Sequence, residues 1–196
     1  MGKELDIYKL HKPDRTYDII DLDIVSMADQ IAEENNLSFR EAVILAKFGF
    51  PSGKTKIADI VTNGFSCKVE KEALKQAFDV NLFANYLILN HKAYNALGKY
   101  LKVYGEFIPL RCDRELILFN PLVFEGEDET LTKKAYLNGI EDGLKSLSFK
   151  TDKHLVFKSY IQGGTALYCN AAFKSLVNEN NLSGLSFNSN LVSIFA

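Results

Sequence analysis

Two stretches of this chain share one local pattern, and this repetition constrains the fold more than any other feature of the sequence. Residues 87–109 and 167–187 each read as an apolar strand, a helix and a second strand. In both, an Asn follows the first apolar run, Asn90 in one and Asn170 in the other. The side-chain oxygen of such an Asn can accept an unpaired backbone N–H at a helix start. The pattern therefore predicts two helices with equivalent caps.

An ungapped superposition of the two stretches sets Tyr94 over Phe173 and Gly105 over Gly184. Apolar residues recur at helical spacing up to the Gly. We expect this Gly to end each helix, because Gly adopts the left-handed conformation at little energetic cost. We predict an α+β fold with a mixed or mainly antiparallel sheet and packed helices. It contains two similar strand-helix-strand units.

The N-terminal part of the chain adds strands and helices to these units. Alternating apolar and polar residues predict strands over 5–10 and 19–25, the second with an acidic face of Asp21 and Asp23. Helical spacing predicts a helix over 69–78. With a chain of 196 residues, we predict a single domain. Its N-terminal region covers residues 1–80 and its α+β part residues 81–196.

Residues 26–48 form the clearest helical region. Apolar spacing predicts two helices with a break at 35–36, and Ser38 with Glu41 matches a capping box at the start of the second. Such a pair could read DNA as a helix-turn-helix. The second helix is mostly apolar and carries only Arg40 and Lys47 as cations, which favours two packed helices.

The central part of the chain is read as strands and one helix, followed by a weakly patterned stretch over 130–149. We predict strands over 83–89, 106–110, 115–120 and 155–157, a helix over 92–101 and a hairpin turn over 111–114.

Charge and hydropathy exclude several classes of protein. A formal net charge of -2 argues against a general nucleic-acid binder, which needs clustered Lys and Arg. No apolar run reaches the length of a membrane span, and residues 1–15 lack the apolar core of a signal peptide. We expect a cytoplasmic protein that binds neither membrane nor nucleic acid.

Cysteine and histidine carry no recognisable motif. The three cysteines, at uneven spacing and without a CxxC pair, fit reduced thiols with structural roles: Cys67, Cys112 and Cys169. The three histidines show no metal-ligand spacing, so we predict no metal and no cofactor. An enzyme with Cys112 as nucleophile and His91 or His154 as base stays an alternative. We expect a protein that is not an enzyme.

The strongest local concentration of charge lies at residues 125–129. Such a run is usually a solvated loop, but opposite charges on a partner would raise the association rate. We hypothesise that Glu125, Glu127, Asp128 and Glu129 lie on a partner-binding surface.

Three motifs carry a family resemblance. Residues 105–110 read GEFIPL, residues 118–122 read LFNPL, and residues 181–187 read NLSGLSF after an aromatic-bearing helix. On these motifs, residues 81–196 resemble a family of immunity proteins of bacterial polymorphic toxin systems. The resemblance implies a cytoplasmic protein that binds a cognate toxin domain, encoded beside it, and blocks it by occlusion. It implies no catalytic residues. The small Cys/His enzyme and the nucleic-acid-binding regulator remain alternatives.

Overall fold

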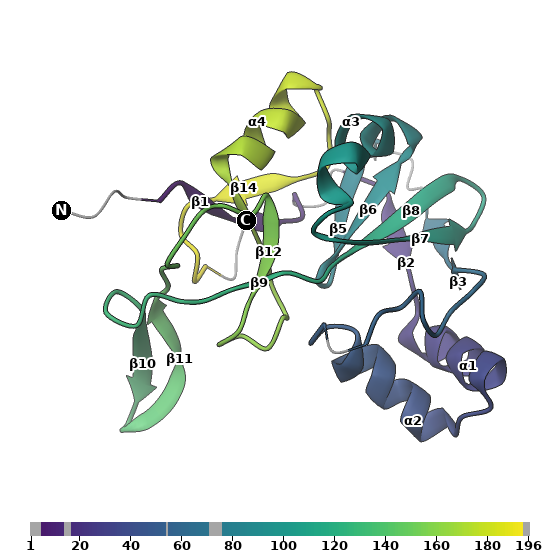
Figure 1. The fold of residues 1–196 in the computed structure, drawn as a ribbon, viewed down its shortest axis with the longest axis horizontal. Coiled ribbons are helices and arrows are strands. Elements are labelled where there is room, and N and C mark those ends of the chain that lie inside the picture. The colour runs from purple at the N-terminus through teal and green to yellow at the C-terminus, as the bar shows by residue number, and fades with distance from the viewer. Residues whose placement is uncertain (1–4, 14–16, 54, 71–75, 194–196) are drawn as a thin grey trace.

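The computed structural model describes residues 5–13, 17–53, 55–70 and 76–193. Within them the protein has an α+β fold built on two five-stranded sheets, as the sequence predicts (Figure 1). The helices are α1 (Ile24–Asn35), α2 (Phe39–Ile44), the π-helix η1 (Leu45–Gly49), α3 (His91–Leu101) and α4 (Ala171–Glu179). Two separate ribbons pair β2 (Ile19–Asp21) with β4 (Lys68–Glu70), and β10 (Lys133–Leu137) with β11 (Ile140–Ser146).

The first sheet has the strand order β3-β7-β8-β6-β5. Its strands are β3 (Phe65–Ser66), β5 (Val80–Phe83), β6 (Tyr86–Asn90), β7 (Gly105–Arg111) and β8 (Glu115–Pro121). β8 is antiparallel to both β6 and β7, so these two strands run parallel with β8 between them. β5 adds antiparallel to β6, and β3 adds parallel to β7.

The second sheet has the order β14-β1-β13-β12-β9. Its strands are β1 (Ile7–His11), β9 (Phe124–Glu125), β12 (Val156–Ser159), β13 (Leu167–Asn170) and β14 (Ser186–Asn188). β1 is antiparallel to both β13 and β14, and β12 is antiparallel to β13. The N-terminal strand β1 therefore takes the place in this sheet that β8 takes in the first.

Each sheet contains one of the predicted strand-helix-strand units, β6–α3–β7 in the first and β13–α4–β14 in the second. The predicted caps are confirmed. The Ala93 N–H donates to Asn90 Oδ1 at 2.9 Å, and the Phe173 N–H donates to Asn170 Oδ1 at 3.0 Å. In both units a strand from elsewhere in the chain separates the two strands.

The ungapped superposition of the units is wrong by one residue over the helices. Setting Asn90 over Asn170, the two observed caps, places Ala93 over Phe173, and both of these side chains are fully buried. Tyr94, which the superposition set over Phe173, is exposed. The cap residue sets the phase of each helix, so it decides which positions face the core.

The predicted glycines do not end the helices. The cap residue of α3, Lys102, stays right-handed, and after α4 the left-handed residue is Asn181, with φ 48°. The glycines are required by close backbone approach instead. A Cβ would lie 2.2 Å from a neighbouring carbonyl oxygen at Gly105 and 2.1 Å from one at Gly184.

The N-terminal helix pair agrees with its prediction. The Glu41 N–H donates to Ser38 Oγ at 3.3 Å and the Ser38 N–H donates to Glu41 Oε2 at 2.9 Å, which confirms the capping box. Asn36, with φ 52°, makes the break between the helices. The second helix continues into the π-helix η1, which the sequence pattern does not predict.

The predicted strand over 19–25 is only partly correct. It ends at Asp21, and Asp23 is the N-cap of α1, accepting the N–H groups of Val25 and Ser26 at 3.2 and 3.1 Å. Asp23 therefore does not share a strand face with Asp21. The capping interaction is local, and it overrides the period-two pattern.

Two further predicted elements differ from the structure. The predicted strand over 83–89 is a hairpin, in which β5 and β6 join through a tight turn at Ala84, φ 51°, and Asn85. The predicted helix over 69–78 begins with Val69 and Glu70, which instead pair with β2. Residues 71–75 of that prediction lie outside the described residues.

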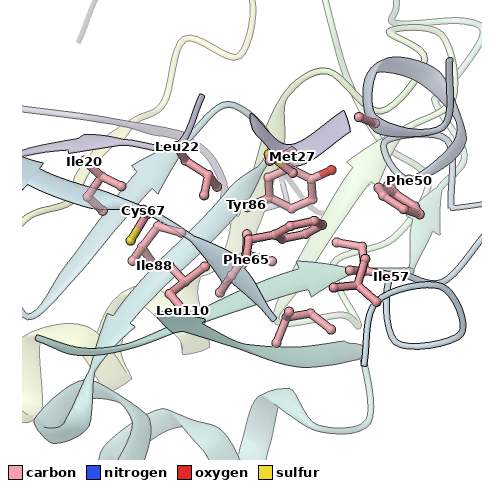
Figure 2. Packing of buried hydrophobic residues seen from close by; sticks show 14 of the residues in the cluster. Ile20, Leu22, Met27, Phe50, Ile57, Phe65, Cys67, Tyr86, Ile88 and Leu110 are labelled. Carbon is pink, nitrogen blue, oxygen red and sulfur yellow. The ribbon is translucent and has the colours of Figure 1, made fainter. Parts of the chain in front are cut away.

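Two cores lie on opposite faces of the first sheet. Alternate strand residues point to opposite faces, so Leu87 packs with α3 and Ile88 packs toward α1 and α2 (Figure 2). In the second sheet, Leu167 joins the same core as α3 and α4, whereas Tyr168 faces a separate cluster. That cluster includes Phe149, from the segment after β11.

The Asn170 cap provides a test of this framework. Asn170→Ala should lower the free energy of unfolding by about 1–2 kcal/mol. It removes the acceptor of the Phe173 N–H and the donor to Asp152 O, which is 2.8 Å away. Urea unfolding measures the change. Asn95→Ala, on the exposed side of α3, should alter stability by less than about 0.5 kcal/mol. An equal loss in both variants would contradict the capping role.

Candidate functional site

A two-stranded arm stands away from both sheets (Figure 1). Its strands, β10 and β11, pair with each other and, among the described residues, with no other strand. The turn at its tip has positive φ at both central residues, 52° at Asn138 and 81° at Gly139. No element is predicted for this stretch, although an Asn-Gly pair is a strong hairpin signal.

The tip of the arm exposes large apolar side chains. Tyr136 is 64% exposed, Leu137 62% and Ile140 74%. A cluster of this kind on a projecting element marks an interaction surface more strongly than single exposed apolar residues do. An ion pair between Lys134 and Glu141, 2.8 Å apart, links the two strands below the tip.

The base of the arm is tied down by side-chain hydrogen bonds. Thr132 Oγ1 donates to Ser148 O and accepts the Ser148 N–H, both at 3.1 Å. Ser146 Oγ donates to Leu131 O at 2.8 Å. These bonds hold the two chains of the arm together at its base.

A groove of about 920 Å³ runs beside the base of the arm. It lies on the face of the second sheet that is turned away from α4, and it shares residues with the cluster around Tyr168. Asp128, Lys145 and Lys150 place charges along it. Its apolar lining is Leu5, Ile7, Leu131, Leu147, Phe149, Leu191 and Val192.

The first two carboxylates of the acidic run are engaged by other residues of the protein. Glu125 is buried on β9 and forms a hydrogen bond with Nδ1 of His154. Glu127 accepts Ser159 Oγ at 2.5 Å and the Ile161 N–H at 3.0 Å. These two residues hold β9 and the turn after β12 in place.

The other two carboxylates lie at the base of the arm. Asp128 accepts the N–H groups of Thr130 and Leu131 at 2.8 and 3.1 Å, and it lines the groove. Glu129 is exposed and lies 3.5 Å from Lys150. The partner-binding role of the run stays a prediction, and Glu129 is the residue with which it can be examined without disturbing the fold.

A buried lysine joins the two sheets. Lys158 on β12 is fully buried, and its Nζ donates to Asn120 Oδ1 at 3.1 Å and to Pro51 O at 3.3 Å. Asn120 Nδ2 in turn donates to Glu106 Oε1 at 2.7 Å. The chain of bonds crosses from the second sheet to β8 and β7 of the first. The rings of Tyr86 and Phe124 lie 5.8 and 5.9 Å from the ammonium.

Glu106 extends this network to the segment after η1. Its carboxylate accepts the N–H groups of Ile57 and Ala58 at 2.8 and 3.0 Å. Burial lowers the pKa of Lys158 to about 7, and the negative charge of Glu106 opposes the shift. No sequence signal identifies Lys158, because a lysine in a short apolar strand usually extends to solvent.

The residues of the alternative enzyme have other partners. Cys112 Sγ, in the turn between β7 and β8, donates to Arg114 O at 3.0 Å. His154 bonds to Glu125, and His91 is the first residue of α3. Within the described part of the chain, no hydrogen bond joins Cys112 to either imidazole. No observed contact therefore supports an active site with Cys112 as nucleophile and a histidine as base.

The N-terminal helices have one face in the core and one outside. Ala28, Ile31 and Ala42 are fully buried against the first sheet. Phe39 on α2 and Phe48 on η1 are exposed.

Across residues 5–13, 17–53, 55–70 and 76–193, no cluster of three or more His, Cys, Asp or Glu side chains could hold a metal ion. None of the helices described there is long and apolar enough to cross a membrane. No protein-family model matches this chain, and no curated protein is similar to it in sequence.

Lys158 gives stability a specific pH dependence. Its pKa is about 7 in the folded protein and 10.5 ordinarily, so between these values the unfolded chain binds more protons. Stability should therefore rise with pH across this range, by up to about 1.4 kcal/mol per pH unit. In Lys158→Met this contribution should disappear, whereas Lys153→Met, at an exposed position, should retain it. Urea unfolding between about pH 7 and pH 10 measures both. A rise that persists in Lys158→Met would refute the assignment.

Proposed function

We propose that this protein binds a cognate bacterial toxin domain and neutralises it by occlusion, without catalysis. The observation that carries the proposal is the arm, whose tip exposes Tyr136, Leu137 and Ile140. Occlusion requires a shaped surface with a few apolar or aromatic anchors and a charged rim. The arm supplies anchors of that kind, and the groove beside it supplies a concave apolar surface.

The hydrogen bonds at the arm base support this role. Ordering a flexible segment upon binding costs free energy, and an arm whose two chains are already joined at the base avoids part of that cost. The hydrogen bonds of Thr132 and Ser146 hold the base in one arrangement. The tip is then free to enter a concave surface of the toxin domain, such as its active-site cleft.

The family resemblance supports the framework of the proposal. Its motifs coincide with β7, with the end of β8 and with the connection from α4 to β14. None of them lies on the arm. The resemblance therefore concerns the sheets and helices, and we infer that the arm confers the choice of toxin.

Charge at the arm base suits a toxin surface with a basic rim. Asp128 lines the groove and Glu129 is exposed next to it. Their negative charges would speed the approach of a basic partner, and Lys150 beside Glu129 moderates the effect.

Removing the apolar tip should abolish neutralisation. Leu137→Ser combined with Ile140→Ser should weaken binding of the toxin encoded beside this protein by at least about 30-fold, because anchor residues carry most interface energy. Calorimetry measures the affinity, and growth of cells that co-express the toxin measures neutralisation. Thermal unfolding should be nearly unchanged.

Val103→Ser is the matched control, since Val103 is 69% exposed but lies in the connection between α3 and β7. It should bind the toxin as the unaltered protein does. Full affinity in the arm variant would refute the proposed role of the arm.

The acidic charge should act on the association rate. Glu129→Lys should lower the association rate constant several-fold at low ionic strength and reduce its salt dependence. Stopped-flow fluorescence measures both quantities. Glu33→Lys, which makes the same charge change at an exposed position on α1, should have a smaller effect. Unchanged association kinetics in Glu129→Lys would remove this residue from the partner surface.

A further inference from the structure

Two cysteines lie next to each other on neighbouring strands. β3 pairs parallel with β7, and Ser66 stands opposite Arg111. Cys67 and Cys112 are the following residues of the two segments. The Cys67 N–H donates to Arg111 O at 3.1 Å, which continues the ladder beyond β3. The two cysteines are therefore neighbours across the ladder, although 44 residues separate them in the chain.

Their side chains point to the same side. At the preceding pair, Arg111 Nη2 donates to Ser66 Oγ at 3.2 Å, so paired positions share a face of the ladder. The Cys112 thiol is also close enough to Cys67 to contribute to the raised pKa of that thiol. Figure 2 shows the Cys67 sulfur at the edge of the core, near Ile88. Neighbouring strands lie about 4.8 Å apart, within the Cα separation that a disulfide spans.

The two thiols differ in access and in environment. Cys112 is half-buried in the turn between β7 and β8, whereas Cys67 is buried. Burial and then the adjacent Cys112 thiol raise the pKa of Cys67 to about 12. Cys67 is therefore a protonated thiol, and the Cys112 thiol is the more accessible of the two. Cys169, fully buried on β13, has no such neighbour among the described cysteines.

We propose that Cys67 and Cys112 are a redox site that forms a reversible disulfide when the protein meets a hydroperoxide. With hydrogen peroxide, the Cys112 sulfur attacks one peroxide oxygen, the O–O bond breaks, and a sulfenic acid and water form. The Cys67 sulfur then attacks the Cys112 sulfur. The S–S bond forms, the S–O bond breaks, and the leaving hydroxide takes the Cys67 proton as a second water. Two electrons pass from the thiols to the peroxide, and an external dithiol reverses the reaction.

The disulfide would fasten the segment between β3 and β4 to the turn between β7 and β8. The closed loop contains β5, β6 and α3, so the unfolded chain loses much conformational freedom. Oxidation should therefore raise the thermal midpoint. In a reducing compartment such a disulfide is transient, which suits a sensor better than a structural staple.

The test uses the full chain treated with hydrogen peroxide and then with an alkylating agent. Before alkylation we expect the intact mass to fall by two hydrogen atoms, and after it we expect non-reducing peptide mapping to link the peptides of Cys67 and Cys112. The thermal midpoint should rise by at least several degrees, and dithiothreitol should restore both values.

Cys169→Ala should respond as the unaltered protein does, whereas Cys67→Ser and Cys112→Ser should show neither the mass loss nor the rise. The mapping on the unaltered protein decides the question even if a variant folds poorly. A product in which Cys112 is sulfinic acid, is linked to a second molecule, or is unmodified would overturn the proposal.

Discussion

Every strand of the two sheets has side chains on both faces, and the need to cover both faces is the constraint on which the remaining structure depends. In the first sheet α3 covers one face, and α1 with α2 covers the other. In the second sheet α4 covers one face, and the arm base and the segment after β14 pack on the other. Both faces of the first sheet are therefore covered, whereas one face of the second sheet is partly open. The groove and the arm occur at that open face.

The junction between the sheets is polar where an apolar contact would be expected. Burying an ammonium is unfavourable unless hydrogen bonds and a counter-charge compensate, and Asn120 and Glu106 provide these for Lys158. Directional bonds also define position more closely than apolar packing does, since only one placement of β12 against β8 satisfies them. The same Glu106 binds the backbone at Ile57 and Ala58. One half-buried carboxylate therefore contacts both the sheet junction and the segment that follows the N-terminal helices.

Local elements could be predicted from the sequence, because the interactions that define them join residues a few positions apart. The Asn90 and Asn170 caps and the box of Ser38 with Glu41 are of this kind. Local patterns also mislead where two of them compete. Asp23 continues an alternating pattern but caps a helix, and the Asn138–Gly139 turn lies in a stretch whose strand period is broken by bulges and by Gly143. Gly105 and Gly184 are a further case. The local pattern predicts that they end the helices, but they are required because backbone distant in the chain approaches them closely.

The sequence by itself determined the α+β class, the two strand-helix-strand units and their caps. Tertiary structure alone decided that β1 completes the second sheet, that Glu125 is buried and Glu127 binds the turn after β12, and that the arm stands beside a groove. It also decided that Lys158 binds Asn120 and that Cys67 lies beside Cys112 across the strand ladder. The physical reason is the range of the interactions. Caps and periodic patterns depend on neighbours along the chain, whereas strand order and buried polar partners depend on which distant surfaces pack together.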